Sequence, residues 1–258
     1  MKIKQIIGAI LMVVMTILGV VLSILISLSI ILNSNTILKA VNNTNYLEKS
    51  KEAAKDVFLN YLPEDKVEEI LTNISVKADI KTLIEAIDTN SIKDIAKVET
   101  DEVKGKIIAV LGDEITEDIK DSFATKVSNE YIKTIFPVTE FSVLGKFVVT
   151  YISKIITVAV AILVIITVIY IYLACGKKTY KWAIIAIYNI IILSIIFVIA
   201  LNVLDGIAIG NKNVTLVILE LINLFRLNVV YISIVWFVIV IISNYIAYFR
   251  KRKHKSNK

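Results

Sequence analysis

The chain has 258 residues, of which 57% are hydrophobic, and its mean hydropathy is +0.75. This composition is far more apolar than that of a water-soluble domain, so it excludes a single soluble fold. The formal net charge of +6 averages two opposite parts: residues 33–145 hold 14 Lys and 21 Asp or Glu, a net of −7, and the rest carries +13. Because the cationic residues gather beside apolar runs and form no basic domain, the charge does not indicate nucleic-acid binding.

Four long apolar runs contain no Asp, Glu, Lys or Arg: residues 6–32, 155–173, 182–204 and 229–249. Each run is long enough to cross the roughly 30 Å hydrocarbon core of a bilayer as a helix. The sequence therefore predicts an all-α integral membrane protein with four transmembrane helices, for which the lipid bilayer is the first partner. Residues 33–145, between the first and second spans, form a separate domain.

The basic residues beside the runs predict the orientation of the chain, because short loops rich in Lys and Arg stay in the cytoplasm. They form three clusters: Lys2 and Lys4; Lys177, Lys178 and Lys181; and Arg250, Lys251, Arg252, Lys253, Lys255 and Lys258. Four crossings bring all three clusters to one side. We therefore expect a multi-pass plasma-membrane protein with both termini and the basic tail 250–258 in the cytoplasm, and with 33–145 outside.

The first run has two interpretations. A cleaved signal peptide is one, but the apolar stretch is about twice as long as a typical signal-peptide core and no A-x-A-like cleavage site follows it. The sequence favours an uncleaved signal anchor. At the second run, a helix that begins at Ile155 leaves Lys154 at the outer interface, where its stem can reach the headgroups.

Residues 33–145 alternate charged and apolar residues at helical spacing, which predicts about five amphipathic helices around a small core. The expected buried positions fall into three groups: Val67, Ile70, Leu71 and Ile74; Ile80, Leu83, Ile84 and Ile87; and Ile115, Ile119, Phe123 and Val127. Pro63 is expected to open one helix, Ser91 and Asp94 to form a capping box, and Gly112 to end a helix. The last helix could continue past Pro137.

The connection 205–228 has two interpretations. Glu220, Asn223 and Arg226 recur every three residues in an otherwise apolar segment, which suits an amphipathic helix lying in the outer interface. Alternatively, residues 214–227 extend the fourth span outward as one long helix, which would need to pack against the outer domain.

No residue set predicts a catalytic, cofactor-binding or metal site, and we do not expect an enzyme. His254 lies in the basic tail and Cys175 at the inner interface, each the only residue of its type. The group Asp113, Glu114, Glu117, Asp118 and Asp121 could share a cation, but the sequence favours an acidic, solvated helix start that needs no ligand. The spans hold only small polar groups, among them Asn189 and Asn244, which favours helix packing over ion transport.

The order of the segments supports a resemblance. A signal anchor is followed by Asn45, Tyr46 and Leu47, which open an acidic helical domain with a Leu62–Pro63 turn, and then by three spans and a basic tail. In this order the chain resembles uncharacterised four-span membrane proteins of Clostridia and related Firmicutes. The resemblance implies the architecture and carries no activity over to these residues.

Two functions are compatible with this sequence. The first is a membrane-tethered extracytoplasmic binding or sensing module that contacts a protein or envelope partner through 33–145. The second is an accessory subunit of a transporter or export complex, with the spans as the interface. The sequence does not identify the ligand or the oligomeric state.

Overall fold

A computed structural model describes residues 2–111, 116–151, 154–175, 179–206 and 212–256. Within these ranges the chain is helical apart from short turns, and no strand occurs. The chain divides into two compact units. We call residues 1–30, 152–207 and 222–258 the apolar unit, and residues 31–151 and 208–221 the helical domain. The predicted all-helical architecture is confirmed.

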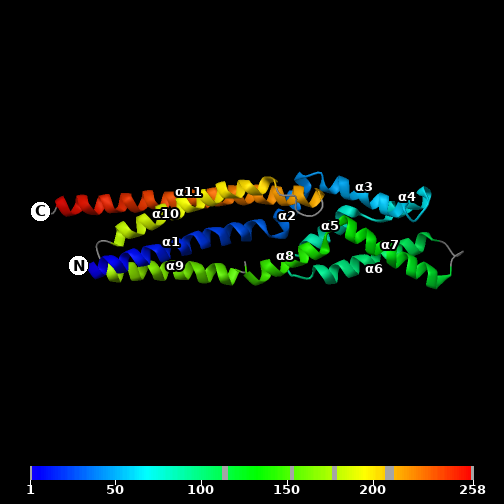
Figure 1. Ribbon diagram of the computed structural model, residues 1–258, viewed down its shortest axis with the longest axis horizontal. Coiled ribbons are helices and arrows are strands. Elements are labelled where there is room, and N and C mark those ends of the chain that lie inside the picture. The colour runs from blue at the N-terminus through cyan, green and yellow to red at the C-terminus, as the bar shows by residue number, and fades with distance from the viewer. Residues whose placement is uncertain (1, 112–115, 152–153, 176–178, 207–211, 257–258) are drawn as a thin grey trace. The chain divides into compact units, whose positions relative to one another are not determined.

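Four helices build the apolar unit (Figure 1): α1 (Lys2–Ile31), α9 (Lys154–Cys175), α10 (Thr179–Ala200) and the later part of α11 (Lys212–Ser256). A short 3₁₀ helix, η2 (Leu201–Gly206), follows α10. Each of the four contains a stretch long and apolar enough to cross a membrane: Ile3–Ile31, Ile156–Leu173, Tyr180–Val203 and Val214–Tyr245.

Most of the aliphatic surface of these helices faces outward. Leu173 is 71% exposed and Ile199 is 60% exposed, and similar side chains occur on all four helices. The buried interior of the unit is small by comparison, with Met15, Ile171 and Ile187 among its members. Soluble proteins rarely expose contiguous apolar patches of this kind, because water does not solvate them well. The four apolar helices therefore indicate a membrane-embedded protein.

Close approach and a few polar contacts hold the four helices together. A Cβ at Gly19 of α1 would lie 2.8 Å from Cγ1 of Ile190 in α10, so only glycine fits the present contact. Trp236 in α11 donates its indole N–H to the hydroxyl of Ser23 in α1 at 3.0 Å. Tyr180 donates its hydroxyl to Asn244, which joins α10 to α11. Ser23 and Asn244 are thus polar groups of the spans that act in packing within the chain.

Helix α11 settles the form of the fourth run. Of the two alternatives for residues 214–227, the structure contains the continuous one, because α11 has 45 residues without a break. At about 1.5 Å per residue this helix is about 68 Å long. Residues 214–227 thus continue into the fourth apolar run as one helix, and Glu220 and Arg226 lie inside a candidate span. The regular spacing of these residues could not distinguish a separate helix from an extended one.

Arg226 has a structural role in the apolar unit. Its Nη2 donates to the carbonyl oxygen of Leu201 at 2.6 Å, and its Nη1 donates to Oδ1 of Asn223 at 3.0 Å. Leu201 is the first residue after α10, so the guanidinium binds a carbonyl at the end of a helix, where the helix dipole favours a cation. This contact ties the end of α10 to α11.

The described residues of the helical domain form seven helices before α9, where the sequence predicted about five: α2 (Ser34–Asn43), α3 (Tyr46–Leu59), α4 (Glu64–Asn73), α5 (Val76–Glu85), α6 (Ile92–Val110), α7 (Glu117–Ile135) and α8 (Val138–Tyr151). Short caps create the extra breaks. Asn33 accepts a hydrogen bond from Thr36 N at 2.9 Å, and Ser75 accepts one from Ala78 N at 3.3 Å. Pro63 precedes α4 as expected, and Pro137 separates α7 from α8.

The core of the domain lies where α3, α5, α6 and α7 meet. Phe58 of α3 stacks on Tyr131 of α7 with ring centroids 5.4 Å apart, and both rings are buried. The predicted core residues Ile80, Leu83 and Val127 are also fully buried. These contacts join helices distant in sequence, so they define the fold of the domain.

Three local predictions have other outcomes. Ile119 is 62% exposed, because the buried face of α7 passes through Ala124, Val127 and Tyr131 and leaves Ile119 outside it. Ser91 precedes α6 but makes no capping bond, and its hydroxyl pairs with that of Thr89 at 2.6 Å. The predicted break at Gly112 and the buried position of Ile115 lie outside the described residues.

We expect Leu83→Asp to destabilise the helical domain by several kcal/mol, on the order of a buried and unpaired charge. Val98→Asp is the matched control, because Val98 is 59% exposed on α6 and should tolerate the charge. Hydrogen exchange of the intact protein in lipid nanodiscs measures the effect in peptides from α5 and α7. Equal protection in the two variants would remove Leu83 from the core.

Candidate functional site

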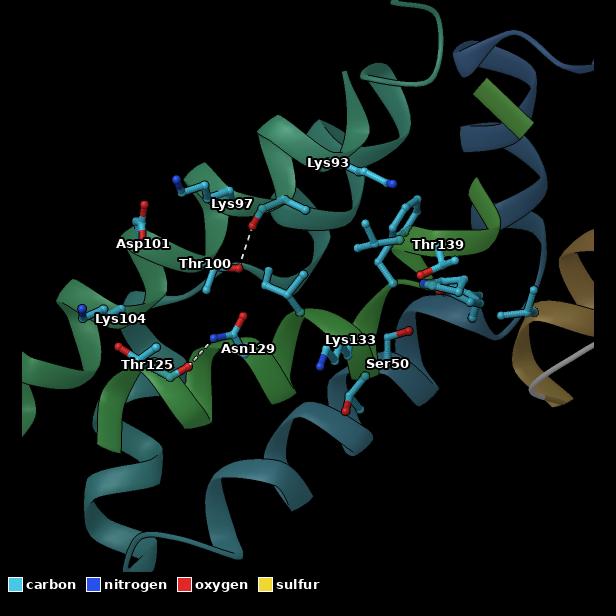
Figure 2. Close-up of a pocket in the computed structure, with 18 residues that line it drawn as sticks. Ser50, Lys93, Lys97, Thr100, Asp101, Lys104, Thr125, Asn129, Lys133 and Thr139 are labelled. Atoms are coloured by element: carbon cyan, nitrogen blue, oxygen red, sulfur yellow. Dashed lines mark hydrogen bonds between the residues drawn. The ribbon is translucent and has the colours of Figure 1, made fainter. Parts of the chain in front are cut away.

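An open cavity of about 720 Å³ lies within the helical domain. Most of its lining comes from α6 and α7 (Figure 2), and α3, the start of α8 and Val214 of α11 contribute the rest. This volume falls within the range of small-molecule sites. The cavity is therefore the candidate functional site of the domain.

Four lysines and one aspartate are the charged residues of the lining: Lys93, Lys97, Asp101 and Lys104 on α6, and Lys133 on α7. The α6 positions lie four, eight and eleven residues after Lys93, so they follow one face of the helix. Four positive charges and one negative charge give the lining a net charge of +3. The helical domain as a whole has more acidic than basic residues, but the lining of this cavity has more basic than acidic side chains.

The lysines of the lining differ in their partners. Lys104 forms an ion pair of 2.6 Å with Asp121 of α7, which spans the cavity wall between the two helices. Among the described side chains, Lys93, Lys97 and Lys133 have no carboxylate oxygen within 4.0 Å of their ammonium groups. Figure 2 shows the labelled lysines spread along the rim, with Lys93 toward the start of α8 and Lys104 near Thr125.

Buried residues form the floor of the cavity, in particular Tyr46, Ala96, Ile132 and Phe136. The Tyr46 hydroxyl donates to the carbonyl oxygen of Ile135 at 2.8 Å, which fixes α3 against the end of α7. Burial raises the pKa of Tyr46 well above its usual value, so its hydroxyl stays protonated at physiological pH. The floor is thus uncharged, and the charge of the site lies at its rim.

Two polar side chains between the lysines are already engaged with backbone. Thr100 donates its hydroxyl to the carbonyl oxygen of Ala96 at 2.7 Å, and Asn129 donates its amide to that of Thr125 at 2.7 Å (Figure 2). The ammonium groups are therefore the strongest donors that the cavity offers to a ligand. Lysine acts as a mobile point charge, which suits recognition of anionic groups.

A second cluster of ionisable groups lies in the core of the same domain. Asp79 of α5, Glu99 of α6 and Tyr131 of α7 are all buried, and the Tyr131 hydroxyl donates to Oδ2 of Asp79 at 2.5 Å. Burial raises the pKa of Asp79, and burial together with the nearby Asp79 charge raises the pKa of Glu99. The Lys106 ammonium partly offsets both shifts. Ionisation of both carboxyl groups, Asp79 and Glu99, is therefore unfavourable in the folded domain.

Of the residues considered from sequence, those that the structure describes make separate contacts. Asp113 and Glu114 lie outside the described residues, as do the side chains of Cys175 and His254. In α7, Glu117 pairs with Lys120 at 3.2 Å and Asp121 pairs with Lys104. Within the described part of the chain, no group of three or more His, Cys, Asp or Glu is arranged to hold a metal ion.

The lysine-rimmed cavity was missed by reasoning from sequence. Lys93, Lys97 and Lys104 lie at helical spacing, which indicates one basic face. Acidic residues lie near each of them in the sequence and the segment has a net negative charge, so this face was not predicted. The buried Asp79 and Glu99 gave no signal, because surface positions of amphipathic helices carry the same residue types.

Comparison of the chain with models of protein families, with curated proteins and with solved structures found no match.

The buried carboxyl pair predicts an unusual pH dependence. A folded-state pKa above the usual 4.5 of Glu99 means that the folded domain binds this proton more tightly than the unfolded chain. The protonated Glu99 carboxyl group therefore contributes its full stability below the pKa of the unfolded chain. This contribution is lost as the pH rises through the pKa of the folded domain. We expect Glu99→Gln to increase the protection of α5 and α7 at neutral pH, and the difference from wild type to shrink as the pH falls.

Hydrogen exchange at several pH values checks this, with each variant compared with wild type at the same pH so that the intrinsic exchange rates cancel. Glu68→Gln is the control, because Glu68 is exposed on α4. Equal protection of Glu99→Gln and wild type at neutral pH would show that Glu99 carries no penalty of burial.

Proposed function

We propose that the chain is a plasma-membrane protein with both termini in the cytoplasm and the domain of residues 33–145 outside. The three basic clusters beside the apolar helices support this orientation. In Figure 1 both ends of the chain, the end of α9 and the start of α10 lie at the same end of the apolar unit. This arrangement fits one cytoplasmic side for all three clusters.

We propose further that the extracytoplasmic domain is a binding or sensing module for a protein or envelope component. The observation that carries this proposal is the open cavity of about 720 Å³ with a buried floor and a cationic rim. Concave sites of this size with a few convergent polar groups are where proteins commonly bind ligands. The apolar unit then serves as its anchor.

The second candidate is an accessory subunit of a transporter or export complex. The exposed aliphatic faces of α9 and α10 favour it, because such faces can pack against the spans of another protein as well as against lipid. Asn244 is engaged with Tyr180, so an interface of this kind would depend on shape and small contacts more than on that amide.

Sidedness is tested by cysteine labelling in intact cells, after Cys175→Ala removes the native thiol. We expect a membrane-impermeant maleimide to label Lys77→Cys and to leave Lys253→Cys unlabelled until the cells are opened. The residue Lys77 is exposed at the start of α5, so the label can reach it wherever the domain lies in water. Labelling of Lys253→Cys alone in closed cells would reverse the orientation.

The choice between the two functions is tested by photo-crosslinking from defined positions. A photoreactive residue at Asn129 probes the cavity, one at Thr72 probes an exposed part of the domain away from it, and one at Leu173 probes the span surface. The binding module predicts adducts from Asn129 and none from Thr72. Protein adducts from Leu173 alone would favour the accessory subunit.

A further inference from the structure

We propose that the cavity between α6 and α7 binds an anionic ligand that carries at least two negative charges, with phosphate groups as the recognised chemistry. This inference rests on the proposed binding function and specifies the class of ligand. Its evidence is the position, number and pairing of the lysines around one cavity in a domain whose net charge is negative.

Charge complementarity sets the minimum charge of the ligand. The lining carries +3, and the ion pair of Lys104 with Asp121 neutralises one of these charges. The remaining +2 comes from three ammonium groups and the carboxylate of Asp101. A neutral or cationic ligand would provide no counter-charge for these ammonium groups, whereas a ligand with two or more negative charges provides one.

The arrangement favours phosphate over a single planar carboxylate. Recognition of one carboxylate typically uses the paired donors of an arginine, and residues 33–145 contain no arginine. Lysines spaced along α6 and a fourth on α7 instead offer separate point charges from both walls. Phosphate oxygens point in several directions and can accept from donors on both sides.

The cavity also has room for more than an anionic group. The floor formed by Tyr46, Ile132 and Phe136 is buried and uncharged, so it can contact an apolar part of the same ligand. A ligand with phosphate at the lysine rim and a less polar body on the floor would use both surfaces. The phosphate could belong to a soluble molecule or to a lipid headgroup, and the experiment separates these sources.

The test uses the intact chain in nanodiscs of zwitterionic phosphatidylcholine, with inorganic tripolyphosphate as the probe and calorimetry as the measurement. The cavity variant is Lys93→Gln/Lys97→Gln/Lys133→Gln. The matched control is Lys39→Gln/Lys51→Gln/Lys77→Gln, which removes the same charge from exposed lysines outside the cavity. Hydrogen exchange of α6 and α7 verifies that both variants are folded.

We expect wild type and the control to bind tripolyphosphate, and the cavity variant to bind it roughly tenfold or more weakly. Lys93→Arg/Lys97→Arg/Lys133→Arg should retain binding, because it keeps the charges. Added salt should weaken binding, since the contacts are electrostatic. Equal affinity of the cavity variant and the control, or no binding to wild type at low salt, would overturn the proposal.

Nanodiscs that contain cardiolipin, whose headgroup carries two phosphates, identify the source of the phosphate. If the anionic lipid competes with tripolyphosphate in wild type but not in the cavity variant, the site binds a lipid headgroup. If the affinity of wild type for tripolyphosphate is the same in both kinds of nanodisc, the site binds a soluble anion. Failure of the anion proposal remains distinct from failure of the binding function. If the photoreactive residue at Asn129 crosslinks to a partner while wild type does not bind tripolyphosphate, the binding function is supported and the ligand is not a phosphate.

Discussion

The aliphatic side chains on the outer faces of α1, α9, α10 and α11 impose the main constraint on this protein. In the part of the chain that the structure describes, the four candidate spans expose most of their isoleucine, leucine and valine surface, and a smaller share of their side chains, including Met15 and Ile187, is buried. In water this surface would be costly, whereas in lipid it is neutral. The charges of the chain consequently gather at the helix ends and in the helical domain.

Inside the apolar unit, association of the helices depends on shape and on a few hydrogen bonds. Lipid chains are as apolar as leucine, so burial alone gives little reason for helices to pack against one another. The close contact at Gly19, the Trp236 to Ser23 bond and the Arg226 contact to the Leu201 carbonyl supply the specificity.

The helical domain is stabilised in a different way from the apolar unit. Its stability comes from an ordinary water-excluding core, with Phe58 stacked on Tyr131 and Leu83 fully buried. Within that core the domain holds Asp79 and Glu99, which cost stability when charged. Perturbed ionisable groups of this kind cluster at functional sites in proteins.

Much of the architecture could be predicted from sequence, because hydrophobic length and helical periodicity are local signals. The four apolar helices and the buried Ile80, Leu83 and Val127 follow directly from them. The exposure of Ile119 and the number of helices could not be predicted this way, since they depend on which neighbour packs against α7 and on caps such as Asn33 and Ser75. The cavity needed the structure for a similar reason: Lys133 reaches the same rim as Lys93 only through the packing of α7 on α6.

The central claim is that the exposed apolar faces of the four long helices contact lipid while the helical domain lies in water. Spin labels at Leu173 and Ile199 on the apolar unit, and at Val98 and Ile119 on the domain, compare equally exposed hydrophobic positions. In nanodiscs, collision with oxygen, which concentrates in lipid, should dominate at the first pair. Collision with a water-soluble nickel chelate should dominate at the second. Preferential collision with the nickel chelate at Leu173 and Ile199 would contradict the account.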